Sequence, residues 1–299
     1  MANTARPTES GEKRSAALNS LIAAVALTAF KVTVGLLTGS LGILAEAAHS
    51  GLDLVAAGMT FLAVRFAGRP ADRSHLYGHG KIENLSALFE TLLLLITCAW
   101  IVWEAVHRLA SSRIDVEVTA WSFIVMITSI VIDYSRSRVL TRVAKKYHSQ
   151  ALEADALHFR TDIWSSGVVI LGLVSVKLGE WLPSLGFLSH GDAVAALGVS
   201  AVVVWVSVQL GRQTVDALLD TAPAGMEEQI AAVVAAVPGV LDCHNIRIRY
   251  SGPVLFVDLH VLVDGGQTLS SVHGLTEVIE VAIQEAIPRA DVTVHPEPF

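Results

Sequence analysis

The chain has 299 residues, of which 53% are hydrophobic and only 16% carry a charge, and its mean hydropathy is +0.55. This apolar composition excludes an ordinary soluble protein, so we expect a membrane protein. The formal net charge is −7, and acidic residues outnumber basic ones most strongly after residue 213. That balance disfavours nucleic acid as a partner and suits a cation.

Six apolar segments follow one another along the first two thirds of the chain. A hydrocarbon core of about 30 Å requires about 20 apolar residues in a helix. The sequence therefore predicts six transmembrane helices over residues 16–212. The segment before them, residues 1–15, is polar for too long to begin a signal peptide, and we expect it to be a disordered cytoplasmic extension. The predicted helices cover residues 16–37, 41–66, 85–109, 118–140, 151–178 and 192–210.

Lys and Arg residues gather in alternate loops. Because cytoplasmic loops of membrane proteins are enriched in Lys and Arg, this asymmetry predicts that both termini lie in the cytoplasm. The basic residues on the predicted cytoplasmic side are Arg6, Lys13, Arg14, Arg65, Arg69, Arg73, Lys81, Arg136, Arg138, Arg142, Lys145 and Lys146.

A His and an Asp four residues apart recur in two predicted helices. His49 and Asp53 lie in the second helix, and His158 and Asp162 lie in the fifth. Residues i and i+4 share one helix face, so each imidazole points the same way as its carboxylate. One such pair is often a hydrogen-bonded pair inside a bundle, but two identical pairs at membrane depth favour a site. Two nitrogens and two oxygens suit zinc in tetrahedral geometry.

The loop between the second and third helices carries Asp72, His75 and His79 at spacings of three and four. One carboxylate and two imidazoles could share a metal ion. Gly78 and Gly80 permit the tight backbone that a compact chelate needs. The alternative is a solvated loop that happens to carry two histidines and binds no metal ion.

Residues 213–299 have the pattern of a separate cytoplasmic domain, with a boundary marked by Pro223 and Gly225. The pattern predicts a helix, two strands around a turn at residues 251–253, a second helix and a last strand. This αββαβ order is typical of a small sheet with two helices on one side, an α+β fold related to ferredoxin-like domains.

Histidines are concentrated in this C-terminal domain. A single histidine is usually a core residue, but four on separate elements of an acidic domain favour a metal cluster. On the second predicted strand, alternation places His260 on the less apolar face. The candidate ligands are His244, His260, His273, His295 and Glu297.

Together these features resemble the cation diffusion facilitator family of metal/proton antiporters, in particular its bacterial zinc and iron exporters. The resemblance covers nearly the whole chain. It rests on the six spans, the αββαβ tail and its histidines, HSGLD and HFRTD in the second and fifth helices, and PADRSHLYGHGKIE between the second and third. It implies a transport site of His49, Asp53, His158 and Asp162, a loop site of Asp72, His75 and His79, and a binuclear tail site of His244, His260, His273, His295 and Glu297.

The resemblance also implies an integral protein of the bacterial inner membrane that is not an enzyme and has no catalytic cofactor. Its ligands would be a divalent metal ion and protons, and it would form a homodimer partly through the tail, with Lys81 and Asp220 as an ion pair near the interface. Two positions depart from the family's pattern. Exporters of broader iron and zinc range often carry Asp in place of His49, which points toward zinc, and the last tail ligand is commonly Asp, one methylene shorter than Glu297.

We therefore expect export of Zn²⁺ in exchange for H⁺ by alternating access, because protons compete with metal for imidazole and carboxylate. Zinc in the tail would be a regulatory ligand that stabilises one dimer arrangement. Transport of Fe²⁺, Cd²⁺ or Mn²⁺ by the same fold is an alternative, as are a passive channel and a receptor or scaffold. A membrane zinc hydrolase is disfavoured, because the sequence has no HExxH motif and offers two matched ligand pairs.

Overall fold

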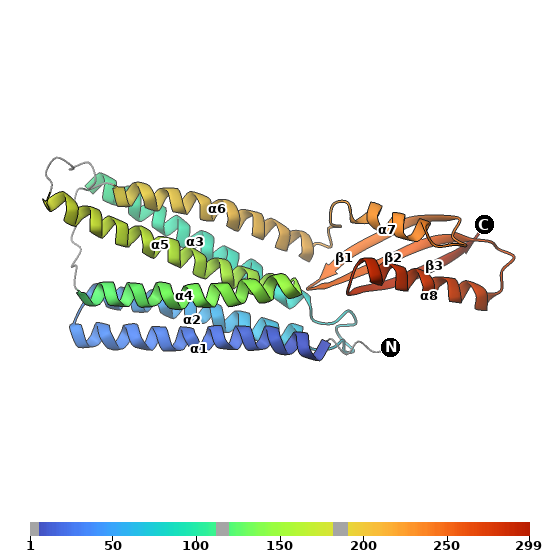
Figure 1. The fold of residues 1–299 in the computed structure, drawn as a ribbon, viewed down its shortest axis with the longest axis horizontal. Helices are drawn as coiled ribbons and strands as arrows, with labels where there is room; N and C mark the ends of the chain where they lie inside the picture. Colours follow the sequence, from blue (N-terminus) through green and yellow to red (C-terminus); the bar gives the residue numbers. More distant parts are fainter. Residues whose placement is uncertain (1–5, 112–119, 182–190) are drawn as a thin grey trace.

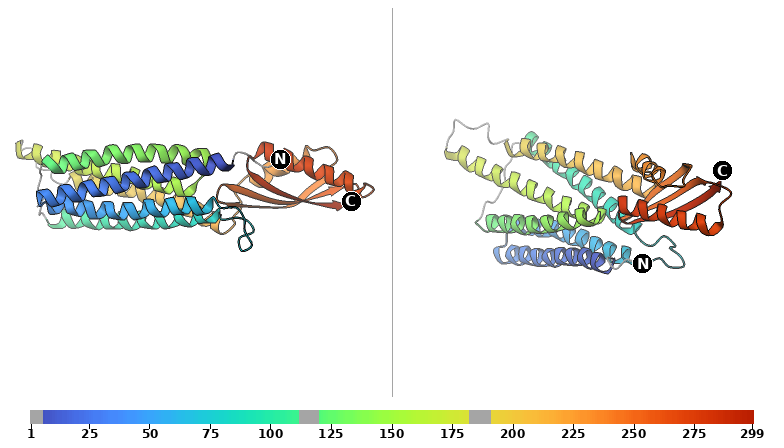
Figure 2. Two further views of the ribbon diagram at one scale, coloured as in Figure 1. Left: turned by 90° about the horizontal axis from the view of Figure 1, so that it is seen from below. Right: turned by 45° about the vertical axis from the view of Figure 1, so that its right-hand side comes forward.

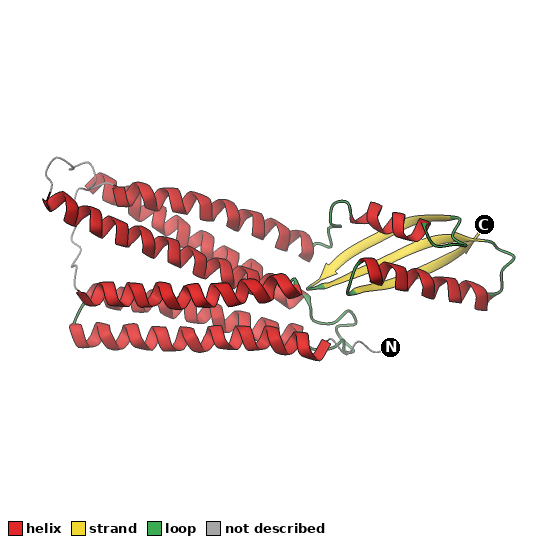
Figure 3. Cartoon of the chain, viewed as in Figure 1, coloured by secondary structure: helices red, strands yellow, loops and turns green. Residues whose placement is uncertain are grey.

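The computed structural model describes residues 6–111, 120–181 and 191–299. Within these residues, six long helices form a bundle, and three strands with two shorter helices form a second domain at one end of it (Figures 1 and 3). The second domain has the element order α7, β1, β2, α8, β3. The predicted fold class, a helical membrane domain followed by an αββαβ domain, is confirmed.

The bundle is built from helices that pack in pairs, α1 with α2, α3 with α6 and α4 with α5 (Figure 2). Its outer surface is apolar, as Leu37, Leu52 and Trp205 illustrate, each more than 65% exposed. Such a surface suits contact with lipid rather than water. The helices are α1 (Arg6–Thr38), α2 (Leu41–Ala67), α3 (Lys81–Ser111), α4 (Ala120–Tyr147), α5 (Gln150–Trp181) and α6 (Gly191–Leu218).

Length and composition alone identify three membrane-crossing segments among the described residues. They are Glu9–Thr38, Glu46–Ala67 and Lys81–Trp103. The bundle has six helices as predicted, and the number of them that cross the bilayer remains a prediction.

The N-terminal segment differs from the disordered extension predicted over residues 1–15. Residues 1–5 lie outside the described part, but α1 already begins at Arg6. Ion pairs to distant residues explain the order. Lys13 is buried with its Nζ 2.7 Å from Oε1 of Glu83 in α3, and the carboxylate of Glu9 lies 3.4 Å from Arg289 of the C-terminal domain. These contacts hold the first turns of α1 against the rest of the protein.

The boundary between the domains also lies later than residue 213. Helix α6 continues to Leu218, because Thr214 and Ala217 are still buried in its last turns. The predicted pair of Lys81 and Asp220 follows directly, with Nζ 2.8 Å from Oδ1. It ties the start of α3 to the segment that leaves α6.

The C-terminal domain is a three-stranded sheet with two helices on one face. Strand β2 (Val254–Val263) lies in the middle, antiparallel to β1 (Asp242–Ser251) and parallel to β3 (Ala290–Pro298). Alternate residues of β2 pack against α7 (Met226–Ala235) and α8 (Leu269–Ala286). The residues in between therefore point to the uncovered face.

The two domains meet at the start of α3. The tight β1–β2 turn packs on Gly80, where a Cβ atom would lie 2.3 Å from the carbonyl oxygen of Ser251. The amide of Gly252 donates a hydrogen bond to the side-chain oxygen of Asn84 at 3.1 Å. Gly252 has a φ of 58°, a conformation that favours glycine, and Gly80 has no room for a side chain. The close approach of the two domains therefore requires glycine at both positions.

Candidate metal sites

The two His/Asp pairs face each other between α2 and α5. Nε2 of His158 lies 3.0 Å from Oδ1 of Asp53 and 3.6 Å from Oδ2 of Asp162. Asp53, His158 and Asp162 offer one ligand atom each, all within 4.8 Å of one another. Helix periodicity presents each pair on one face, and the contact between α2 and α5 brings the two faces together.

His49 completes the set from the more exposed side. Its Nε2 lies 3.9 Å from Oδ1 of Asp53 and 3.8 Å from Oδ1 of Asp162, and its side chain is 38% exposed. Zinc bonds of about 2.0–2.2 Å in a tetrahedron place neighbouring ligand atoms roughly 3.3–3.6 Å apart. The four distances between these ligand atoms, 3.0–3.9 Å, bracket that range, so a small closing movement of His49 would give four-coordinate geometry.

Two polar atoms of this group have no hydrogen-bond partner among the described residues. They are Nδ1 of His158 and Oδ2 of Asp162, and both are buried. Buried polar atoms are rarely left unsatisfied. A cation beside Asp162 would satisfy its oxygen, which favours a metal site over a pair of internal hydrogen bonds.

A further acidic residue beside the site, not predicted from the sequence, is Asp155, which lies one turn before His158 in α5. Asp155 is completely buried, and Ser20 of α1 donates a hydrogen bond to it at 3.3 Å. The same hydroxyl accepts from Arg136, which also pairs with Asp133 at 3.2 Å. The signal was the DALH sequence itself, since i and i+3 share a face. These groups form a polar layer beside the metal ligands.

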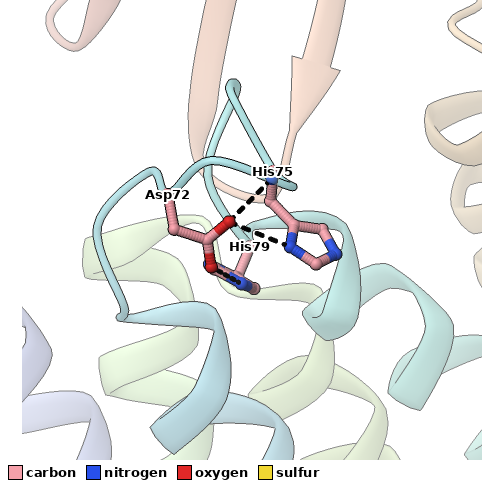
Figure 4. A group of neighbouring side chains, drawn as sticks. All are labelled: Asp72, His75 and His79. Carbon is pink, nitrogen blue, oxygen red and sulfur yellow. Dashed lines mark hydrogen bonds and ion pairs between the residues drawn. The ribbon is translucent and has the colours of Figure 1, made fainter.

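The loop residues Asp72, His75 and His79 also converge (Figure 4). Oδ1 of Asp72 lies 3.3 Å from Nδ1 of His75, and its Oδ2 lies 3.3 Å from Nε2 of His79. The two imidazole rings are 4.4 Å apart between centroids. Gly78 has a φ of 77°, which confirms the tight backbone predicted there.

The carboxylate of Asp72 has a structural task as well. It accepts hydrogen bonds from the hydroxyl of Ser74 and from the amides of Ser74 and His75, at 2.8–2.9 Å. These bonds, that of the Ser74 hydroxyl first, hold the pKa of Asp72 well below its usual range. Asp72 therefore stays ionised and holds the loop in shape, while its Oδ2 faces His79.

The tail cluster lies on the uncovered face of the sheet, where His244, His260 and His295 are paired neighbours on three adjacent strands. Glu297 joins them. Its Oε1 lies 2.8 Å from Nδ1 of His260 and 3.8 Å from Nε2 of His295, and its Oε2 lies 3.3 Å from Nε2 of His244. The longer Glu side chain thus reaches all three imidazoles. The hydrogen bond from His260 is the main reason that the pKa of Glu297 is lowered.

His273 does not join this cluster within one chain. It lies on α8, which covers the opposite face of the sheet, and its nearest ion-pair partner is Glu277 at 3.7 Å. Within one chain, His273 therefore lies apart from the other four candidate tail ligands.

The bundle and its clusters define a class of protein. Imidazole and carboxylate side chains converge between the helices of a bundle with an apolar surface, and further His-containing clusters lie in the loop before α3 and in the attached domain. Membrane proteins conserve such costly groups at pathways for ions. The fold and the site are those of a membrane transporter for divalent metal cations.

Comparisons with known proteins identify the family. Residues 17–219 match the cation efflux transmembrane domain, and residues 222–299 match the cytoplasmic domain of cation efflux proteins. The chain belongs to this cation efflux family, the cation diffusion facilitators. It is a metal cation efflux transporter and not an enzyme, and the second match, to the family's dimerisation domain, supports a homodimer.

Two curated relatives extend over most of the chain. The cation-efflux pump FieF of Yersinia enterocolitica (serotype O:8 / biotype 1B) is 31% identical over 288 residues, which cover 95% of this chain and 92% of that protein. FieF of Yersinia pestis (strain Pestoides F) is 32% identical over 292 residues, with the same shares covered.

Solved structures are similar to part of the chain. The zinc form of CzrB is 29% identical and covers 26% of this chain and 89% of that chain, with a TM-score of 0.25. A structure of the MamM C-terminal domain is 27% identical and covers 24% of this chain and 94% of that chain, with a TM-score of 0.24.

Proposed function

We propose that the protein exports Zn²⁺ from the cytoplasm in exchange for protons. The convergence of Asp53, His158 and Asp162 between α2 and α5, with His49 at the open side, carries this proposal. Two carboxylates cancel the double charge of the ion in a medium where uncompensated charge is costly. Two imidazoles supply nitrogen ligands that zinc accepts.

The same four ligands provide the coupling to protons. Metal binds neutral imidazole and ionised carboxylate, so a proton on either group competes with the ion. A site that opens to the cytoplasm loads metal and loses protons. When it opens to a more acidic exterior, protonation of His49 or His158 releases the metal.

Zinc is favoured over other divalent ions by the type of ligands. Fe²⁺, Cd²⁺ and Mn²⁺ are the alternatives for the same fold, and carboxylate-rich sites suit the harder ions among them. His49 replaces one oxygen donor with nitrogen and so shifts the set toward zinc.

We also propose that all six helices of the bundle cross the bacterial inner membrane, with both chain termini in the cytoplasm. The basic residues of the loops support this orientation. The N-terminal end of α1 lies beside the C-terminal domain, as Glu9 and Arg289 indicate, so one side of the membrane holds both. In this proposal the partners of the protein are the bilayer and, through the exchange, protons.

The loop and tail clusters would hold regulatory zinc. His244, His260, His295 and Glu297 form the tail site within one chain. In a homodimer, His273 of the second copy could complete it, because the fold keeps a chain's own His273 on the far side of the sheet. Metal that binds one dimer arrangement better than another stabilises that arrangement.

Transport by the purified protein in proteoliposomes tests the main proposal. Metal uptake is measured for Zn²⁺, Cd²⁺, Fe²⁺ and Mn²⁺ in competition, with and without a pH gradient, for the wild type and His49→Asp. We expect zinc to compete best, flux to follow the pH gradient, and His49→Asp to gain preference for iron. Zinc flux that ignores the pH gradient would indicate a channel, and an unchanged preference in His49→Asp would refute the argument from ligand type.

A further inference from the structure

A cavity of about 200 Å³ opens where α4, α5 and α6 meet, at the end of the bundle that faces the C-terminal domain. Its floor is apolar and includes Ala144, Leu157 and Leu210. Its rim is polar, and it has two basic residues and one acidic residue. The rim consists of Thr141, Lys145, Glu153, Arg160, Gln209 and Gln213.

This cavity is separate from the metal ligands. In α5, successive residues turn by about 100°, so Glu153, Leu157 and Arg160 share one face of the helix. His158 and Asp162 lie on the opposite face, against α2. Two cations at the rim also disfavour a metal ion as the occupant.

The cations around the cavity have no acidic partner. Lys145 and Arg160 are exposed, and no carboxylate lies within ion-pair distance of either among the described residues. Arg138 and Arg142 lie on the same stripe of α4 and are likewise exposed and unpaired there. By contrast, the neighbouring Lys146 pairs with Glu12 at 2.7 Å. Four cations without a carboxylate partner in the described part of the chain therefore lie on or beside the cavity.

The change from apolar to aromatic to basic residues along the outer surface of α4 and α5 indicates that the cavity lies at the level of the lipid headgroups. Along the exposed stripe of α4, the apolar residues Ile127 and Val131 give way to Tyr134 and then to Arg138. On α5, Trp164 follows Arg160 by one helical turn, away from the C-terminal domain, and the Arg160 guanidinium lies 5.8 Å from its ring. Tyr and Trp are enriched where the membrane meets water. The basic residues begin directly beyond this aromatic level.

We propose that the cavity between α4, α5 and α6 binds the headgroup of an anionic phospholipid, with its phosphate between Lys145 and Arg160. Gln209 and Gln213 supply further donors, and the acyl chains run along the exposed apolar stripe of α4. Basic pockets between membrane helices recognise anionic headgroups by this combination of charge and adjoining apolar surface.

The test measures lipid binding to the full-length protein in nanodiscs of phosphatidylcholine with a minor fraction of phosphatidylglycerol. Mass spectrometry of the lipids retained after detergent exchange gives the affinity for phosphatidylglycerol. The double variant Lys145→Gln/Arg160→Gln should lose roughly thirtyfold in affinity. Glu153→Gln, which removes the one carboxylate of the rim, should gain affinity, a change that misfolding does not produce.

The matched control is Arg65→Gln/Arg69→Gln, which removes two exposed charges at the same end of the bundle but away from the cavity. It should retain phosphatidylglycerol as the wild type does. Equal loss in the control, or no loss in the cavity variant, would overturn the proposal. Thermal protection by inorganic phosphate alone, in phosphatidylcholine nanodiscs, equal to that by phosphatidylglycerol would assign the cavity to a soluble anion and overturn it as well.

Discussion

Arg289 of the C-terminal domain donates a hydrogen bond to the backbone carbonyl oxygen of Tyr147, the last residue of α4, at 2.9 Å. The same guanidinium pairs with Glu9 of α1 at 3.4 Å. One side chain in the turn after α8 thus touches two helices of the bundle. Together with the β1–β2 turn at Gly80, it gives the C-terminal domain two separate contacts with the bundle.

Removing this contact should loosen the junction without unfolding either domain. Arg289→Ala loses a hydrogen bond and a partly exposed ion pair, together worth about 1 kcal/mol. We expect faster amide hydrogen exchange at the end of α4. The control is Arg247→Ala, an exposed arginine of β1 for which no ion pair is found in the described residues. Equal exchange in the two variants would contradict a role for Arg289 at the junction.

The transport site predicts a sharp difference between two carboxylates. Asp162→Asn removes an anionic ligand, and zinc transport should fall by more than about a hundredfold. Glu46→Gln, also a carboxylate to amide change, affects a half-exposed residue that pairs with Lys31. It should leave transport within a fewfold of the wild type in proteoliposome uptake. Comparable losses in both would mean that the ligand set is wrong.

The two tasks of Asp72 can be separated. Asp72→Asn keeps an oxygen that accepts from the amides of Ser74 and His75 but removes the negative charge. We expect zinc affinity of the loop to fall while the loop keeps its shape. Asp72→Ala removes both and should also raise hydrogen exchange in residues 72–79. Isothermal titration on a His158→Ala/His260→Ala background, which removes a ligand from each of the other two sites, measures the loop site, and unchanged affinity in Asp72→Asn would exclude Asp72 as a ligand.

The buried ion pair of Lys13 and Glu83 should matter far more than an exposed one. Lys13→Met leaves the carboxylate of Glu83 buried, with the hydroxyl of Ser149 as its one remaining side-chain partner among the described residues, and we expect a loss of about 3 kcal/mol. Lys146→Met breaks the exposed pair with Glu12, which water and salt screen, and should cost far less. Thermal unfolding in detergent compares the two, and similar losses would contradict the buried network.

The lowered pKa of Glu297 predicts how acid affects the stability of the metal-free C-terminal domain. Since its folded-state pKa is lowered, chiefly by His260, the ionised carboxylate stabilises the fold above its unfolded pKa of about 4.5. That contribution is lost as the pH falls through the lowered value. Glu297→Gln should therefore flatten the decline in Tm below pH 5, whereas Glu285→Gln, an exposed carboxylate of α8, should not. Parallel curves for all three proteins would disprove the pairing.

The helical faces and the strand pattern were visible in the sequence because both depend on local periodicity. The i, i+4 spacing of His49 with Asp53 and of His158 with Asp162 predicts the candidate metal site. The αββαβ order follows from the alternation of apolar residues and from the turn residues. The order of the first turns of α1 was not visible. It depends on Glu83 and Arg289, which lie 70 or more residues away in the chain.

His273 and Asp155 show the same limit in two directions. The concentration of histidines in the C-terminal domain led us to include His273 among the candidate tail ligands, although the helix that carries it packs on the opposite face of the sheet. Asp155 was passed over because one acidic residue in an apolar helix says little until Ser20 and Arg136 are placed beside it. Packing between elements decides both cases.

The bare backbone contact of Gly80 and Gly252 leaves no room for a side chain on either partner. The interface between the helix bundle and the C-terminal domain therefore tolerates substitutions as poorly as a packed core does, and not as readily as a linker. A chimaera that carries the C-terminal domain of another exporter will assemble only if the β1–β2 turn of that domain can approach residue 80 as closely. Even Gly80→Ala would push the two domains apart.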